Sequence, residues 1–158
     1  MGAINNAFNQ VAGTVAGAAL AVKHAKETDF AKMNSADSTA MVARNQAKDA
    51  KAEYDEAYHE ASQKDGLVEQ LAKAEINETR AKRAYIKAKN RKNGSIETRL
   101  KKFDELDAAK KAADKLRNKY EALESMGKRV NEQINYANKA TELAIQAKQK
   151  YQSRWGGK

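Results

Sequence analysis

Two long heptad-like stripes of small and apolar residues constrain this fold more than any other feature. The first steps by four and three residues without a miss, a spacing that places every member on one face of a helix packed along a partner. The chain of 158 residues contains no proline, the residue that costs about 3 kcal/mol inside a helix. We therefore expect an all-α protein with long helices. The first stripe consists of Ala36, Ala40, Ala43, Ala47, Ala50, Tyr54, Ala57 and Ala61.

Asp65 and Gly66 interrupt this stripe, which then restarts out of phase. A shift of this kind is either absorbed in a continuous helix or becomes a kink. We expect a continuous helix with local unwinding and a possible kink at 65–66. The restarted stripe consists of Leu67, Leu71, Ala74, the polar Glu78, Ala81, Tyr85 and Ala88.

A turn is predicted at 93–95, where Asn93, Gly94 and Ser95 follow one another. Gly94 is expected to take the left-handed conformation that ends a helix, and Ser95 to accept a backbone N–H at the start of the next. Ile96, Leu100 and Phe103 then begin a second stripe. After a one-residue adjustment it continues as Leu106, Ala109, Ala113, Leu116, Tyr120, Leu123, Gly127, Val130, Ile134, Ala137, Thr141, Ala144, Lys148 and Tyr151.

These patterns predict a long antiparallel helical hairpin, a coiled coil, with an apolar N-terminal helix. We expect the N-terminal helix at 1–27, the first arm at 28–92, the turn at 93–95, the second arm at 96–152 and a flexible end at 153–158. Two helices have no second layer to cover apolar residues that lie off the stripes, so self-assembly or docking on a larger structure is expected. Those residues are Val42, Ile76, Ile86, Leu143 and Ile145.

The N-terminal segment is free of charge from Met1 to Val22 and carries an apolar helical stripe. Gly13 and Gly17 have the small-xxx-small spacing that lets two helix backbones approach closely. Packing on neighbouring subunits, contact with lipid and an unstructured tail are three alternatives for this segment. The residues expected to make oligomer or membrane contacts are Ile4, Phe8, Val11, Gly13, Val15, Gly17 and Val22.

The net charge of +9 is concentrated in residues 80–102, where ten basic residues meet only one acidic residue. Nucleic-acid phosphates, acidic lipid headgroups and an acidic protein surface are candidate partners, and a solvated end that only keeps the protein soluble is the fourth alternative. Only Tyr85 and the adjoining Phe103 are aromatic in this region, so DNA binding would be independent of sequence. The predicted polyanion-binding residues are Arg80, Lys82, Arg83, Lys87, Lys89, Arg91, Lys92, Arg99, Lys101 and Lys102.

Enzymatic chemistry is not indicated by any motif. The chain has no cysteine, which excludes disulfides and thiolate metal sites, and His24 and His59 lie far apart without the i, i+4 partner of a helical metal site. No phosphate-binding loop or nucleophile elbow is present. We expect no catalytic residue, no metal, no cofactor and no small-molecule substrate.

The Met-Gly start, the small-residue run from Gly13 to Gly17 and the long Ala/Lys/Gln/Asn-rich helices together resemble the internal, ejection or pilot-like proteins of bacteriophage virions. The resemblance implies a structural virion component that assembles into a homo-oligomer and contacts other virion proteins. This multimer would assist genome delivery through the host envelope. The resemblance also implies a place inside the virion, within the capsid or at the portal or tail, and in the host envelope on delivery. Outside that setting we expect the protein in the cytoplasm. A nucleic-acid-condensing helical protein and a membrane-active helical protein are the alternatives.

Overall fold

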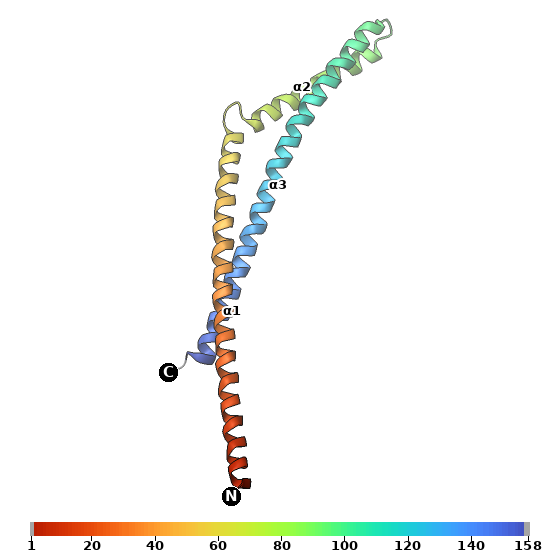
Figure 1. Cartoon of the computed structure of the whole chain (residues 1–158). Helices are drawn as coiled ribbons and strands as arrows, with labels where there is room; N and C mark the ends of the chain where they lie inside the picture. Colours follow the sequence, from red (N-terminus) through yellow and green to blue (C-terminus); the bar gives the residue numbers. More distant parts are fainter. Residues whose placement is uncertain (1, 157–158) are drawn as a thin grey trace. The chain divides into compact units, whose positions relative to one another are not determined.

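The computed structural model describes the backbone of residues 2–156 and the side chains of residues 16–156. Three α-helices follow one another: α1 (Gly2–Ser62), α2 (Leu67–Asn90) and α3 (Ile96–Trp155), and the described residues contain no strand (Figure 1). The all-α prediction is confirmed. The chain divides into two compact units, Met1–Ala47 with Gln133–Lys158, called the terminal unit, and Lys48–Glu132, called the central unit.

The terminal unit has a core made almost entirely of alanine. Ala40 and Ala43 from α1 are 0% and 4% exposed, and Ala137 and Ala144 from α3 are 4% and 9% exposed. No large side chain is fully buried among the described residues. Because alanine fills so little volume, the two backbones lie close together along this core. The full cluster is Ala40, Ala43, Ala47, Ala137, Ala140 and Ala144, with Ala36 and Ile134 packed against it.

A clasp joins the end of α3 to α1 within the terminal unit. The indole Nε1 of Trp155 donates a 2.9 Å hydrogen bond to Asp29, and the guanidinium of Arg154 donates one of the same length. Both contacts lower the pKa of the Asp29 carboxyl, with the indole hydrogen bond as the first cause. Phe30 packs on Tyr151 at 5.6 Å between ring centroids. The prediction of a flexible end from residue 153 is therefore wrong for 153–155, which are helical.

The N-terminal part of α1 lies beyond this clasp. Helix α1 runs through the predicted boundary at 27–28 without a break. Every described side chain from Ala16 to His24 is exposed, and Leu20 and Val22 are 67% and 55% exposed. No contact within the terminal unit therefore covers this stretch of the described chain.

The central unit contains a helix break where the sequence predicted a continuous helix. Helix α1 ends at Ser62 and α2 begins at Leu67. Asp65 adopts the left-handed backbone conformation (φ 61°), whereas Gly66 is extended (φ −79°, ψ −179°). The N–H of Asp65 donates to the Glu69 carboxylate at 3.0 Å, and this bond lowers the pKa of Glu69. The expectation of continuity is wrong because these local hydrogen bonds replace the helical ones.

The turn between α2 and α3 lies close to its predicted place. Helix α2 ends at Asn90 and α3 begins at Ile96. The Ser95 hydroxyl accepts the backbone N–H of Thr98 at 3.1 Å, which confirms Ser95 as a helix cap. Gly94 does not adopt a positive φ, so its predicted left-handed conformation is wrong.

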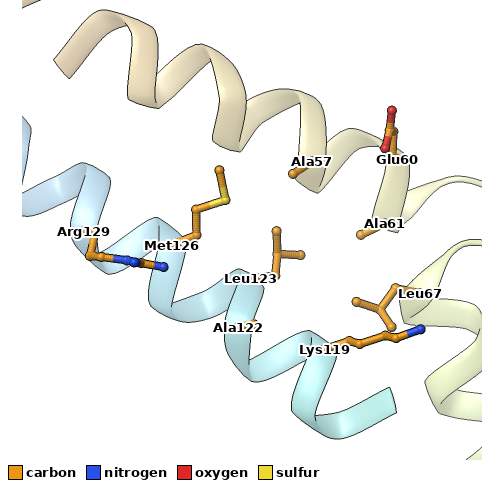
Figure 2. A pocket seen from close by; sticks show the side chains of 9 residues that line it. All are labelled: Ala57, Glu60, Ala61, Leu67, Lys119, Ala122, Leu123, Met126 and Arg129. Carbon is orange, nitrogen blue, oxygen red and sulfur yellow. The ribbon is translucent and has the colours of Figure 1, made fainter. Parts of the chain in front are cut away.

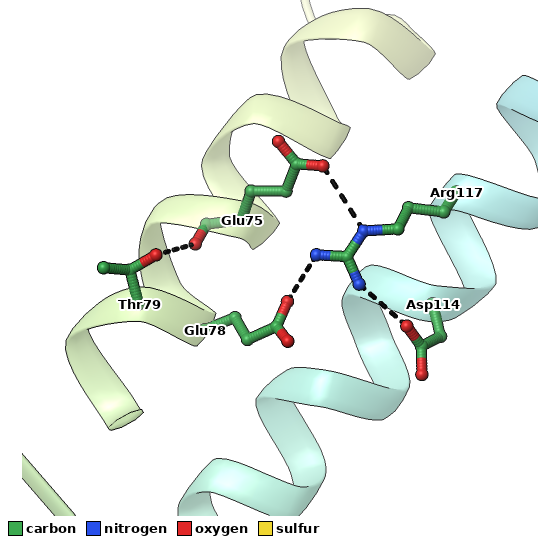
Figure 3. Close-up of polar contacts among 5 residues, drawn as sticks. All are labelled: Glu75, Glu78, Thr79, Asp114 and Arg117. Carbon is green, nitrogen blue, oxygen red and sulfur yellow. Dashed lines mark hydrogen bonds and ion pairs between the residues drawn. The ribbon is translucent and has the colours of Figure 1, made fainter. Parts of the chain in front are cut away.

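Arg117 forms ion pairs between α3 and α2 in the central unit (Figure 3). The Arg117 guanidinium from α3 contacts Glu75 and Glu78 across the interface and donates to Asp114 on its own helix at 2.7 Å. Hydrogen bonding to Glu78 is the first cause of a raised Arg117 pKa. Glu78 is the polar interruption of the first-arm stripe, and this pairing explains why a carboxylate is tolerated there.

Candidate polyanion-binding site

The candidate site is the end of the central unit where α2 turns back into α3. We call residues 80–102 the basic tip. It comprises the second half of α2, the turn and the first two turns of α3, and in Figure 1 it forms the green end of the α2–α3 pair. Two helices that run in opposite directions bring cations from both sides of the turn to one end. Eight of the ten predicted residues are exposed: Arg80, Lys82, Arg83, Lys87, Lys89, Arg91, Lys92 and Lys101.

The other two predicted cations, Arg99 and Lys102, serve the local structure. Arg99 is half-buried and donates from Nη2 to the carbonyl of Arg91 at 3.2 Å, which closes the turn. Its Nε is buried and has no hydrogen-bond partner among the described atoms. Lys102 pairs with Glu105 at 3.1 Å. We therefore expect these two residues to contribute less to anion binding than the eight exposed ones.

The eight exposed cations have no carboxylate within ion-pair distance in the described part of the chain. The ion pairs of the central unit join other residues, namely Lys73 with Glu69, Lys111 with Asp107, Lys102 with Glu105, and Arg117 with its three carboxylates. The only acidic residue of the basic tip is Glu97. Like charges this dense produce a strong positive potential, which favours the approach of an anion.

An exposed apolar stripe runs beside these cations at the start of α3. Ile96, Leu100 and Phe103 are 73%, 58% and 49% exposed. The sequence predicted that these three residues would begin the stripe that packs on the first arm. This prediction is wrong for Ile96 and Leu100, whereas Phe103 does pack on Tyr85 of α2. Tracing the three-four spacing backwards from Leu106 leads to Lys102 and Arg99 instead, and both are half-buried.

The physical reason for this change of phase lies in the long basic side chains. Lysine and arginine can lay their methylene stems against an interface while their charged ends reach water or a partner. Arg99 also gains the hydrogen bond to Arg91 that closes the turn. The interface near the tip is therefore formed by Arg99 and Lys102 together with the buried Ala88 and the Tyr85–Phe103 contact. Ile96 and Leu100 remain exposed.

Tyr85, the aromatic residue of the basic tip, packs on Phe103, which directly follows the basic tip. Tyr85 from α2 and Phe103 from α3 have ring centroids 5.7 Å apart and an interplanar angle of 63°, an edge-to-face contact. The contact covers one face of one ring and an edge of the other, and it holds both rings against each other. This arrangement favours contact with phosphates over base stacking.

A second feature of the central unit is an apolar hollow at the helix break (Figure 2). It is open to solvent and has a volume of about 560 Å³. Leu123 and Met126 point from α3 towards α1, and Leu67 closes one end (Figure 2). Glu60, Lys119 and Arg129 supply its charged groups.

The remaining sequence candidates lie apart from the basic tip. Gly17 and Val22 are exposed on α1, whereas Ile4, Phe8, Val11, Gly13 and Val15 lie outside the described side chains. His59 contacts Gln63 at 3.0 Å. The described residues contain no group of side chains that could hold a metal ion. Among the helices, none within the described range is long and apolar enough to cross a bilayer.

Anion binding is the chemistry that the basic tip offers, because it presents many N–H donors and positive charges on a well-formed turn. The sequence analysis missed the exposed apolar stripe beside it, because an apolar pattern favours Ile96 and Leu100 over Arg99 and Lys102 as interface residues. Comparison with protein-family models, with curated proteins and with solved structures finds no match for this chain.

Proposed function

We propose that this chain is a non-catalytic helical protein that binds a polyanion through its basic tip. One observation carries the proposal: eight exposed cations gather at one turn and have no carboxylate partner in the described structure. Charges held this close repel one another and lower the stability of the turn unless an anion compensates them. A binding role explains why the rest of the chain balances its charge while this turn does not.

The architecture that we propose for this role is an antiparallel coiled-coil hairpin that assembles with copies of itself. Its support is the stripe of small residues shared by α1 and α3 in the terminal unit and by all three helices in the central unit. Apolar residues off the stripes are exposed and available to neighbouring copies: Met41, Val42, Ile76, Tyr136, Leu143 and Ile145 are between 50% and 61% exposed. The N-terminal part of α1 would contribute to the same assembly.

A place in a bacteriophage virion is the biological setting that we propose, as an internal or ejection protein whose multimer assists genome delivery through the host envelope. The support is the resemblance in sequence style together with a polyanion-binding end and a helical body. In this setting the anion is either the packaged DNA or the lipid of the host envelope. A nucleic-acid-condensing protein outside a virion would use the same cations.

A salt series tests the polyanion proposal. Neutralising Arg83, Lys87, Arg91 and Lys92 to Gln should weaken binding to heparin and to duplex DNA and should flatten the salt dependence. Each phosphate contact contributes a slope of about −0.9 in log affinity against log salt, so the loss of four contacts should remove about 3 to 4 units of slope.

The matched control neutralises four exposed cations outside the basic tip, Lys23, Lys26, Lys32 and Arg44, again to Gln. Both variants lose the same net charge, so a general effect of charge would be identical in the two. Selective loss in the basic-tip variant supports the proposal. Equal losses, or binding that does not respond to salt, would contradict it.

A further inference from the structure

The exposed apolar stripe at the start of α3 distinguishes the basic tip from a purely electrostatic surface. Ile96 and Leu100 are one helical turn apart and Phe103 follows, so at 100° per residue the three lie within about 60° of one another on the helix. They remain 73%, 58% and 49% exposed. Contact with phosphates alone would leave these side chains in water.

Cations lie around this stripe on both sides of the turn. Lys101 neighbours Leu100 on α3, while Lys89, Arg91 and Lys92 occupy the end of α2 and the turn that leads directly to Ile96. A surface that offers apolar side chains close to several exposed cations matches the boundary of an anionic bilayer. There, lipid phosphates lie just outside the acyl chains.

We infer that the basic tip docks on an anionic lipid bilayer, with Ile96 and Leu100 entering the boundary between headgroups and acyl chains while the neighbouring cations contact lipid phosphates. The inference rests on the proposed polyanion binding and names its partner. Entry is shallow, because only the first turns of α3 carry the apolar stripe. Phe103 remains packed against Tyr85 of α2 and does not enter the bilayer.

A bilayer accounts for the stripe better than nucleic acid does. Aliphatic side chains have no planar face for stacking on bases, and the two aromatic rings are already in contact with each other. Removing Ile96 and Leu100 from water, in contrast, is favourable in proportion to their exposed apolar area. Both the charges and the apolar residues then contribute to one interaction.

Three carboxylates line a shallow open hollow beside Leu100, namely Glu97, Asp104 and Glu105. Glu105 pairs with Lys102, so Glu97 and Asp104 are the two that weaken this interaction. Negative lipid headgroups repel them, so their presence weakens docking and makes it dependent on ionic strength. Replacing both by the neutral amides, Glu97→Gln with Asp104→Asn, should strengthen binding to anionic vesicles by several-fold while leaving the apolar stripe intact.

The decisive experiment measures binding of the full chain to vesicles of equal parts phosphatidylglycerol and phosphatidylcholine, and separately to duplex DNA. The double variant Ile96→Gln with Leu100→Gln changes two exposed side chains, so folding should be preserved and is checked by circular dichroism. We expect its vesicle affinity to fall by about tenfold or more, since two partly exposed aliphatic groups no longer leave water. DNA affinity should stay unchanged.

A matched control replaces Leu143 and Ile145 by Gln, since they are 61% and 52% exposed in the terminal unit. Leu100→Trp gives a second measurement, because its fluorescence should shift to shorter wavelength on anionic vesicles and not on pure phosphatidylcholine. Equal losses in the Ile96/Leu100 and control variants, loss of DNA binding in the Ile96/Leu100 variant, or no shift for Leu100→Trp would overturn the bilayer assignment. Failure of polyanion binding itself would be recognised differently, as unchanged DNA and vesicle binding after neutralisation of Arg83, Lys87, Arg91 and Lys92.

Discussion

Gly66, the glycine of the helix break, is predicted not to tolerate replacement by alanine without a loss of stability. A Cβ atom at this position would lie 2.6, 2.7 and 2.8 Å from the carbonyl oxygens of Glu60, Ala61 and Gln63. All three contacts are shorter than real Cβ contacts and all three involve backbone, which cannot rotate away as a side chain can. The substitution Gly66→Ala therefore requires the end of α1 to move.

The magnitude follows from the number of contacts. Overpacking costs about 1–3 kcal/mol, and three simultaneous backbone contacts place Gly66→Ala near the upper end. The smaller entropy of the unfolded chain offsets at most about 1 kcal/mol. We expect a net loss of about 2 kcal/mol in the free energy of unfolding. For a chain of this size that corresponds to a fall of about 4–8 °C in Tm.

Thermal unfolding followed by far-ultraviolet circular dichroism measures this loss, and Gly94→Ala is the control. At Gly94 a Cβ would meet Arg91 Cβ at 3.3 Å and the Ala88 carbonyl at 3.4 Å. These distances need only a slight adjustment, and the φ of Gly94 is not positive, so Tm should change little. A higher Tm for Gly66→Ala together with increased helicity would refute the reasoning, because it would mean that a continuous helix through the break is the more stable form.

Three further predictions concern the contacts within each unit. Ala40→Leu, at a position with 0% exposure, should lower the free energy of unfolding by about 1–3 kcal/mol in urea denaturation, because the alanine core has no room for a larger side chain. Arg117→Gln should lower Tm by less than Gly66→Ala, and the difference from the parent should shrink at high salt, since exposed ion pairs are screened. Trp155→Phe should raise the pKa of Asp29 towards its ordinary value of 3.8, measured by NMR titration of the carboxyl, because the main cause of the lowered pKa is removed. In the parent, this lowered pKa stabilises the fold above pH about 3.8 and the stabilisation is lost as pH falls through the folded pKa, so acid should destabilise the Trp155→Phe variant less.

The helical stripes could be predicted from the sequence because small and apolar residues recur at the spacing of a packed helix face. Ala40, Ala43, Ala113 and Val130, all members of the predicted stripes, are among the most buried residues of the described chain. The cap at Ser95 was equally predictable, since a serine hydroxyl directly before a helix can accept one of the free backbone N–H groups of the first turn. Local periodicity and capping chemistry are thus sufficient for these features.

The start of α3 and the helix break could not be predicted in the same way. Ile96 and Leu100 are more apolar than Arg99 and Lys102, so an apolar pattern assigns the wrong residues to the interface. Their true phase depends on the Arg99 hydrogen bond to Arg91, a contact across the turn. At the break, glycine is the usual left-handed residue, yet Asp65 takes that conformation because its N–H and carbonyl bond to the side chains of Glu69 and Gln70.

The clasp at the end of α3 was missed for a related reason. Trp155 lies next to a terminal Gly-Gly-Lys sequence, which is typical of a flexible end. Its indole N–H nevertheless bonds to Asp29, a residue 126 positions away in the sequence. No periodic pattern links such distant positions, so only the folded structure reveals the pair.

The clasp has a particular consequence for a core built from alanine. Ala36 and Ala43 on α1, and Ala137 and Ala144 on α3, recur at the spacing of one heptad, so these alanines alone distinguish only weakly between alignments that differ by a heptad. Side chains that differ from one alignment to the next are those of Ile134 and of the clasp, where Asp29 contacts Trp155 and Arg154, and Phe30 contacts Tyr151. The last turns of α3 therefore help to fix the lengthwise alignment of α1 with α3.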